Sequence, residues 1–279
     1  MNLTRIAIVL DKSGSMGNDH QNPTRTSETV EGYNKQIREI VSNSNSQDIK
    51  LSLFTFNQTV YEHLIDVDAK ELTEATVESY NPSGWTAWYD GLGYAIEKLE
   101  ELGKNDPECS YLVITISDGQ ENHSTHFNSN TLRKKIDACK ATKKWTFSFM
   151  GCNDSDIKEF NETSGTRTSF QWSNAKSGDT EKSMRYASAK LGDYLNKQRQ
   201  EGVLADEDYW IPKSAWGVEG PQGSIGPQGA QGSIGFNSAE VDAELSSYTE
   251  AKCLNNIDSV FNKGSNLSLI HISEPTRRR

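Results

Sequence analysis

Cysteine is scarce in this sequence, with four residues in a chain of 279. The cysteines show no CxxC spacing, and their number is too low for a disulfide framework or for a typical zinc site. Reduced thiols in a cytosolic compartment are the simplest interpretation. The four residues are Cys109, Cys139, Cys152 and Cys253.

Long apolar runs and internal clusters of basic residues are absent as well. The first apolar run, Ile6 to Leu10, is far too short for a signal peptide or a membrane span, so we expect a cytoplasmic location and no membrane contact. The formal net charge is -10, and the only block of basic residues is formed by the last three arginines. Such a chain would repel a phosphate backbone, which argues against a nucleic-acid partner and favours bound cations or basic partner surfaces.

Apolar residues make up only 34% of the chain, which is little for a protein that is packed throughout. A length of 279 residues allows one sizeable α/β domain and a smaller appendage. We therefore expect a compact domain over residues 1–200 and a looser, polar remainder.

Short apolar runs alternate with helix-like segments as far as about residue 200. This alternation predicts a parallel sheet with helices on both faces. Two runs are joined only by Asn57 and Gln58, which predicts an antiparallel hairpin at the sheet edge. The expected α/β fold is thus a doubly wound, mostly parallel six-stranded sheet with one antiparallel edge strand. Strands are expected at about 5–10, 49–56, 59–65, 111–116, 145–150 and 166–171, and helices at about 27–43, 87–102, 129–141, 154–162 and 178–199.

Beyond residue 200 the composition changes. Every third residue from Gly217 to Gly235 is glycine, so the predicted linker over 201–236 contains collagen-like G-X-Y triplets. Proline occupies only X positions, and a flexible linker and a stalk that trimerises the protein both remain open. Ser238 is a suitable cap for a short helix within 237–266.

The last residues have a different character. Leu267 to Arg277 resemble the in-frame translation of a sequencing-library adaptor. We therefore treat 267–279 as an artefact and set it apart from the fold. The natural sequence is expected to continue differently after about residue 266.

Five oxygen-bearing side chains follow predicted strands or open a predicted helix. Asp11, Ser13 and Ser15 come directly after the first strand, Thr86 lies at a helix start, and Asp118 follows the strand that ends at Ile116. In a doubly wound sheet the carboxyl ends of the strands form one rim, where ligands bind. Mg²⁺ prefers about six hard oxygen ligands, and the set contains no His or Cys that would favour zinc or copper. The sequence predicts an Mg²⁺ site, with Mn²⁺ or Ca²⁺ as alternatives.

The pattern Asp-x-Ser-x-Ser with a distant Thr and a distant Asp resembles the metal-ion-dependent adhesion site of the von Willebrand factor A family, over about residues 4–200. Where that family often has a glycine before the threonine, this chain has Trp85. The resemblance implies a non-enzymatic module whose metal captures a Glu or Asp of a protein partner. It extends to A-domain proteins of bacteria and phages, so a virion-associated location is an alternative. Rim residues around the contact would be Trp85, Asn18, His20 and His123, for which ordinary loop solvation is the competing interpretation.

Two other interpretations remain at the same residues. Asp, Ser and Gly dominate turns, so the segment from Asp11 to Ser15 is also compatible with a simple turn. A metal-assisted hydrolase is the alternative function. Ser13 as its nucleophile lacks a Gly-x-Ser-x-Gly elbow. The conceivable bases are His20, His63, His123 and His126.

Overall fold

The computed structural model describes residues 3–45, 47–74, 79–152, 154–165, 169–171 and 176–201. The chain divides into two units, Met1–Ser238 and Ala239–Arg279, and all described residues belong to the first. The predicted collagen-like linker, the short helix over 237–266 and the adaptor-like segment lie outside the described residues, apart from Glu201 at the start of the linker.

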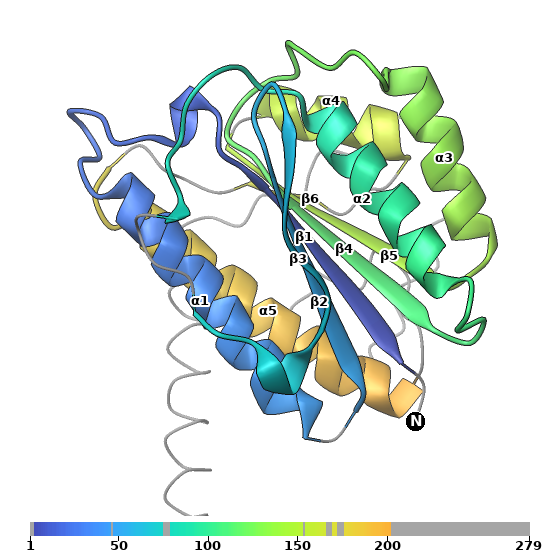
Figure 1. The fold of residues 1–279 in the computed structure, drawn as a ribbon. Coiled ribbons are helices and arrows are strands. Elements are labelled where there is room, and N and C mark those ends of the chain that lie inside the picture. Colours follow the sequence, from blue (N-terminus) through green and yellow to red (C-terminus); the bar gives the residue numbers. More distant parts are fainter. Residues whose placement is uncertain are drawn as a thin grey trace, which may run out of the picture. The chain divides into compact units, whose positions relative to one another are not determined.

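A mixed sheet forms the centre of the described part of the chain (Figure 1). The strand order is β3-β2-β1-β4-β5-β6, and only the β2–β3 pair is antiparallel within it. The predicted α/β fold with one antiparallel edge strand is confirmed, while β6 contains only three described residues. The bounds are β1 Thr4–Asp11, β2 Ile49–Phe56, β3 Val60–Asp68, β4 Ser110–Ile116, β5 Trp145–Gly151 and β6 Ser169–Gln171.

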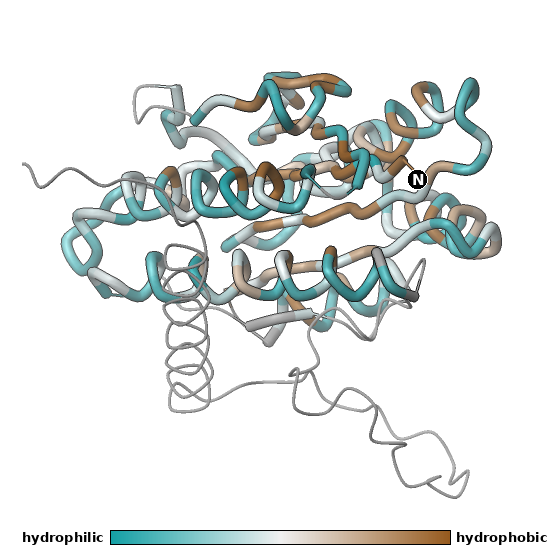
Figure 2. Tube along the Cα trace, turned by 90° about the horizontal axis from the view of Figure 1, so that it is seen from below, coloured by the Kyte–Doolittle hydropathy of each residue, from teal (hydrophilic) through white to brown (hydrophobic). Residues whose placement is uncertain are grey.

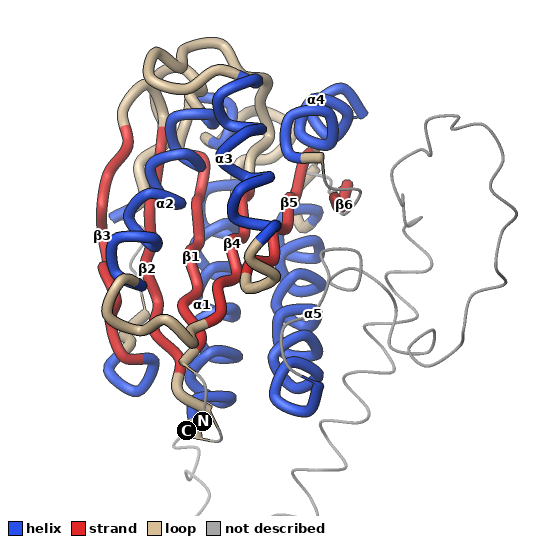
Figure 3. The backbone as a smooth tube through the Cα atoms, turned by 90° about the vertical axis from the view of Figure 1, so that its right-hand side faces the viewer, coloured by secondary structure: helices blue, strands red, loops and turns tan. Residues whose placement is uncertain are grey.

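Helices cover both faces of this sheet. Figures 1 and 3 show α1 and α5 on one face and α2, α3 and α4 on the other. Two short 3-10 helices, η1 (Gly14–Met16) and η2 (Ala69–Glu71), were not expected from the sequence. The bounds are α1 Arg25–Ser44, α2 Trp88–Gly103, α3 Ser129–Ala141, α4 Asp154–Ser164 and α5 Asp179–Glu201. None of the described helices is long and apolar enough to cross a membrane.

The strands β1, β4 and β5 are apolar, as expected of strands whose two faces are both covered. Every residue of β1, β4 and β5 is buried, and Figure 2 shows the apolar residues concentrated along the strands. On the face of α2, α3 and α4, Trp88, Phe149 and Phe160 lie in one apolar cluster. Burying such a side chain stabilises the fold by about 1.5–3 kcal/mol. The core therefore fixes the central strands, whose ends carry the predicted site.

Candidate metal centre

The predicted metal ligands lie at the end of the sheet where the parallel strands finish. β1 and β4 are neighbours in parallel register, with Leu10 opposite Ile116. Asp11 ends β1, and Asp118 comes two residues after the end of β4, so the two carboxylates project from adjacent strand ends. The loops after the strands gather at the end of the sheet opposite the N-terminus (Figure 3).

Hydrogen bonds join four of the five predicted ligands. The Ser13 backbone N–H donates to Asp11 Oδ1 at 2.6 Å, which turns the chain from β1 into η1. The Ser13 and Ser15 hydroxyl oxygens are 3.1 Å apart, and Ser15 donates to Asp118 Oδ1 at 2.6 Å. The 3-10 helix η1 is therefore a local consequence of the Asp11 carboxylate, and it brings both serines towards Asp118.

Thr86 completes the set from the loop before α2. A Cβ atom built on Gly119 would lie 3.0 Å from Thr86 Oγ1 and 3.4 Å from Ser15 Oγ, so both hydroxyls lie against the glycine that follows Asp118. Asn122 holds Thr86 in place: its Oδ1 accepts from the Thr86 N–H at 2.9 Å, and its N–H donates to the Thr86 carbonyl at 3.0 Å. The structure thus brings all five predicted residues together.

Both carboxylates of the site are buried. Asp11 has no exposed surface, and the Asp118 side chain is 3% exposed. Burial is the main cause that raises the pKa of Asp11 to about 7, and the negative charge of Asp118 adds to it, while a hydrogen bond from Ser117 acts in the opposite direction. Two buried carboxylates at one point create a need for positive charge.

Arg25, at the first position of α1, meets part of this need. Its Nη1 lies 4.0 Å from Asp118 Oδ2, and the same nitrogen donates to the Ser15 carbonyl at 2.5 Å. Its Nη2 donates to Asp19 Oδ2 at 2.7 Å. The guanidinium therefore holds the loop that contains Ser15 and brings a positive charge to Asp118.

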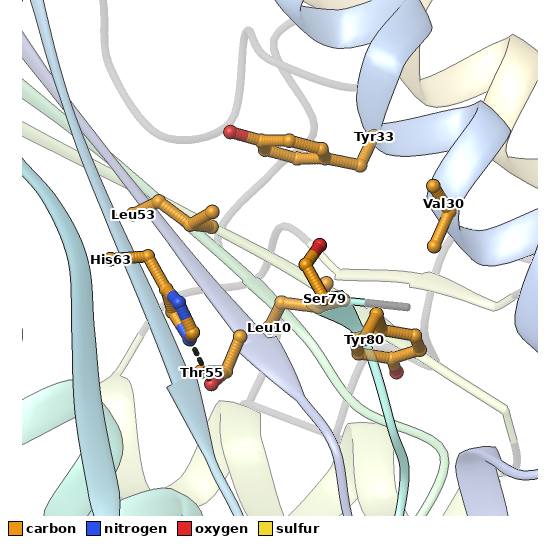
Figure 4. Close-up of a pocket in the computed structure, with 8 residues that line it drawn as sticks. All are labelled: Leu10, Val30, Tyr33, Leu53, Thr55, His63, Ser79 and Tyr80. Atoms are coloured by element: carbon orange, nitrogen blue, oxygen red, sulfur yellow. Dashed lines mark hydrogen bonds between the residues drawn. The ribbon is translucent and has the colours of Figure 1, made fainter. Parts of the chain in front are cut away.

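A small cavity lies behind the site, between α1 and the strands β1, β2 and β3 (Figure 4). Its volume is about 30 Å³, which is room for about two water molecules. The Tyr80 hydroxyl, at its wall, donates to the Asp11 carbonyl at 2.5 Å. Its lining residues are Leu10, Val30, Tyr33, Leu53, Thr55, His63, Ser79 and Tyr80. The hydrogen bond from Tyr80 to the Asp11 carbonyl therefore joins the wall of the cavity to the candidate metal centre.

The donor set fits a hard divalent cation. Among the described residues no group of three His, Cys, Asp or Glu side chains gathers in the way a zinc or all-carboxylate site requires. The present set instead combines two carboxylates with three hydroxyls, which are hard oxygen donors suited to Mg²⁺. The burial of Asp11 and Asp118 at one point, where the charge of Asp118 helps to raise the pKa of Asp11, is the structural observation that agrees with a cation.

The contacts give little support to a serine hydrolase. The Ser13 hydroxyl pairs with Ser15, and the His63 ring pairs with Thr55 at 2.7 Å. Within the described ranges no hydrogen bond joins Ser13 to a histidine. A nucleophile needs such a base within reach.

Several residues of the site were missed by the sequence reasoning. Ser117, whose hydroxyl donates to Asp11 Oδ2 at 2.6 Å, was visible as the neighbour of Asp118 but was given no role. Asn122, Arg25 and Tyr80 had no local signal, because each contacts the site only through the folded chain.

The expected rim residues lie in loops around the site. Trp85 is 62% exposed, and its ring stacks on His123 with centroids 6.5 Å apart and an angle of 11° between the planes. The Asn18 side chain accepts from the Thr26 N–H at 2.8 Å and so belongs to the start of α1. His20 is exposed in the same loop.

Comparison with known protein families identifies the family of the chain. Residues 6–184, more than half of the chain, match the model of the von Willebrand factor type A domain, and the chain belongs to this family. Domains of this family are generally protein-interaction modules and are mostly non-enzymatic. Comparison with curated proteins gave no match.

Several solved structures are similar to this chain at low sequence identity. The PilB minor pilin from Streptococcus sanguinis is 15% identical with a TM-score of 0.50, over 72% of this chain and 62% of the pilin. The SpRpn10 VWA domain is 11% identical with a TM-score of 0.48, over 65% and 93% of the two chains. The von Willebrand factor type A protein from Catenulispora acidiphila is 17% identical with a TM-score of 0.47, over 68% and 43%. The chain therefore spans less than two thirds of the pilin.

Proposed function

We propose that the domain over about residues 1–200 is a divalent-cation-dependent module that captures a Glu or Asp of a protein partner. The observation that carries this proposal is the convergence of two buried carboxylates and three hydroxyls from three separate segments at one end of the sheet. The ligands would be Asp11, Ser13, Ser15, Thr86 and Asp118, with Mg²⁺ as the resident ion and Mn²⁺ or Ca²⁺ as substitutes.

The predicted ligands differ in charge and in exposure. Asp11 and Asp118 lie buried beneath the site and supply negative charge, either directly or through water. Ser15 is exposed, so the site is accessible from its side. The bound cation supplies positive charge, and a carboxylate of the partner can complete its coordination. Ser15, which donates to Asp118 in the present arrangement, has to turn its hydroxyl hydrogen away when its oxygen faces a cation.

Titration calorimetry with Mg²⁺ and Mn²⁺ tests the site. We expect Asp11→Ala and Asp118→Ala each to abolish measurable binding, because each removes one of the two carboxylates that offset the charge of the ion. The circular dichroism spectrum should persist, since both residues lie outside the apolar cluster.

A matched control for this experiment is Asp137→Ala. Asp137 is an exposed carboxylate on α3 that pairs with Arg133. This variant should bind both ions as the wild type does. Unchanged binding in Asp11→Ala and Asp118→Ala together would refute the proposal.

The location and assembly of the protein also remain proposals. We infer a cytoplasmic or virion-associated protein that contacts neither nucleic acid nor membrane, on the grounds of its acidic charge and apolar pattern. Trimerisation would use the glycine triplets over 217–235.

A further inference from the structure

Trp85 is the most exposed of the large hydrophobic side chains in the described ranges, at 62%. It directly precedes Thr86, so it belongs to the loop that carries one of the candidate ligands. Tyr61 and Tyr94 are the next most exposed, at 37% and 39%, and each has a polar or charged contact of its own. An exposed indole next to a binding site is typical of an interaction surface, because tryptophan contributes more than most residues to protein interfaces.

The backbone on either side of Trp85 is held in place. The Trp85 backbone N–H donates to Gln58 Oε1 at 3.1 Å. Gly84 precedes it with a φ of 83°, a backbone conformation that favours glycine, and a Cβ atom there would overlap Gln58 Oε1. The Gly84 carbonyl also accepts from the Gly14 N–H at 3.0 Å, which ties the loop to η1. The loop that carries Trp85 is thus joined to η1, which contains the candidate ligand Ser15.

The second ring of this surface comes from the other side of the site. The His123 ring stacks on Trp85 with nearly parallel planes, and the His123 backbone N–H donates to Glu121 Oε1 at 2.8 Å. The loop after β4, which carries Asp118, therefore supplies the partner ring. A surface that is ordered before binding loses little conformational entropy when a ligand contacts it.

We propose that the Trp85–His123 surface binds an aromatic side chain adjacent to the acidic residue that the metal captures. This inference rests on the proposed function and adds selectivity to it, because a carboxylate alone is the same in every Glu and Asp. The occupant is a peptide segment in which Glu or Asp is flanked by an uncharged aromatic residue. A cationic neighbour could also stack on an indole, but the Trp85 and His123 rings already lie with nearly parallel planes, an arrangement that a further aromatic ring extends.

The test uses the full chain in Mg²⁺ and three peptides of defined sequence. The first is acetyl-Gly-Phe-Glu-Phe-Gly-amide, the second replaces both Phe residues by Gly, and the third replaces Glu by Gln. We expect the first peptide to bind about tenfold more tightly than the second, the size typical of losing one central aromatic contact. The third should not bind measurably, because it has no carboxylate for the ion.

Variants separate the ring surface from the metal centre. In Trp85→Ala the ratio between the first two peptides should fall to about one, and in Tyr94→Ala it should stay at about ten, because Tyr94 lies on α2 and donates to Glu62. A Mg²⁺ titration of each variant shows whether its metal site is intact. Should Trp85→Ala lose the ion, His123→Ala supplies the ratio instead, and it too should fall.

The outcomes distinguish the two proposals. Equal binding of the first two peptides to the wild type, or an unchanged ratio in both ring variants, overturns the aromatic surface but leaves metal-dependent capture in place. If neither Glu peptide binds in a manner that requires Mg²⁺, the proposed function fails, and the selectivity inference fails with it.

Discussion

At the scale of single residues, two hydrogen bonds from Asn122, a residue of another loop, hold the backbone of Thr86. Asn122 accepts from the Thr86 N–H with its side chain and donates to the Thr86 carbonyl with its backbone. The threonine is therefore positioned across the site by the loop after β4, which also carries Asp118. Such supporting contacts commonly determine how well a metal ligand is oriented.

We predict that Asn122→Ala weakens Mg²⁺ binding about tenfold, because the loss of a supporting hydrogen bond around a metal site commonly costs 10–100-fold in affinity. Calorimetric titration measures the change. Asn130→Ala, an exposed asparagine on α3, should leave the affinity unaltered. Equal affinities in all three proteins would mean that Thr86 needs no such clamp.

The proximity of the five predicted ligands could be predicted from the sequence because each follows a strand end or opens a helix, and the parallel order brings those points together. Their supporting residues could not be found in this way. Tyr80 reaches Asp11 over a separation of 69 residues, and Asn122 reaches Thr86 over 36. Contacts of this kind depend on loop paths, which neither apolar periodicity nor residue type determines.

At the scale of elements, the loop between β4 and α3 is fastened to the start of α2. The Asp90 carboxylate accepts from the N–H groups of Thr125, His126 and Phe127, at distances from 2.7 to 3.3 Å. In the reverse arrangement, the loop supplies the acceptor: the Glu121 carboxylate accepts from the N–H of Tyr89 on α2 at 3.0 Å. These two carboxylates hold the loop that supplies Asp118, Asn122 and His123.

Asp90→Ala should lower the free energy of unfolding by about 1–3 kcal/mol, because it leaves three backbone donors without their buried acceptor. Asp90→Asn, which retains one oxygen acceptor, should lose less. Urea denaturation of these variants and of Glu97→Ala, an exposed residue on the same helix, measures the differences. A loss in Asp90→Ala no larger than in Glu97→Ala would show that the loop is held by other contacts.

Strands and helices were predictable to different degrees for physical reasons. β1, β4 and β5 are buried on both faces, so each appears in the sequence as a continuous apolar run. The 3-10 helix η1 has no such pattern. The Ser13 N–H meets the nearby Asp11 carboxylate, but the Gly14 N–H meets the carbonyl of Gly84, a residue far away in the sequence, and that contact exists only after the chain has folded.

At the scale of the whole molecule, the candidate site places like charges in the interior. Asp118 raises the pKa of Asp11 by its negative charge, and Arg25 lies 4.0 Å from Asp118. Repulsion between buried charges lowers the free energy of unfolding of the entire domain. A cation at the site would convert this repulsion into attraction, so the stability of the fold should depend on the ion.

We predict a reversal of stability between wild type and Asp11→Asn, measured by thermal unfolding at a pH above the Asp11 pKa of about 7. In EDTA the variant should unfold at the higher temperature, since it removes one of two like charges. In excess Mg²⁺ the wild type should be the more stable protein, because binding to the folded state alone raises stability. The expected scale is about 2–4 °C for each kcal/mol. The same order of stability in both buffers would contradict the prediction.

The position of β4 beside β1 has a consequence for the way the chain is made. Ser117 contacts Asp11 across 106 residues, and β2 and β3 lie between them in sequence. On a translating ribosome β1 and β2 can pair early, yet the half-built centre holds only the Asp11 carboxylate until β4 has emerged and taken its place. Under the proposed function, a nascent chain would therefore acquire the ability to bind a partner only after β4 and the loop that carries Asp118 have been synthesised.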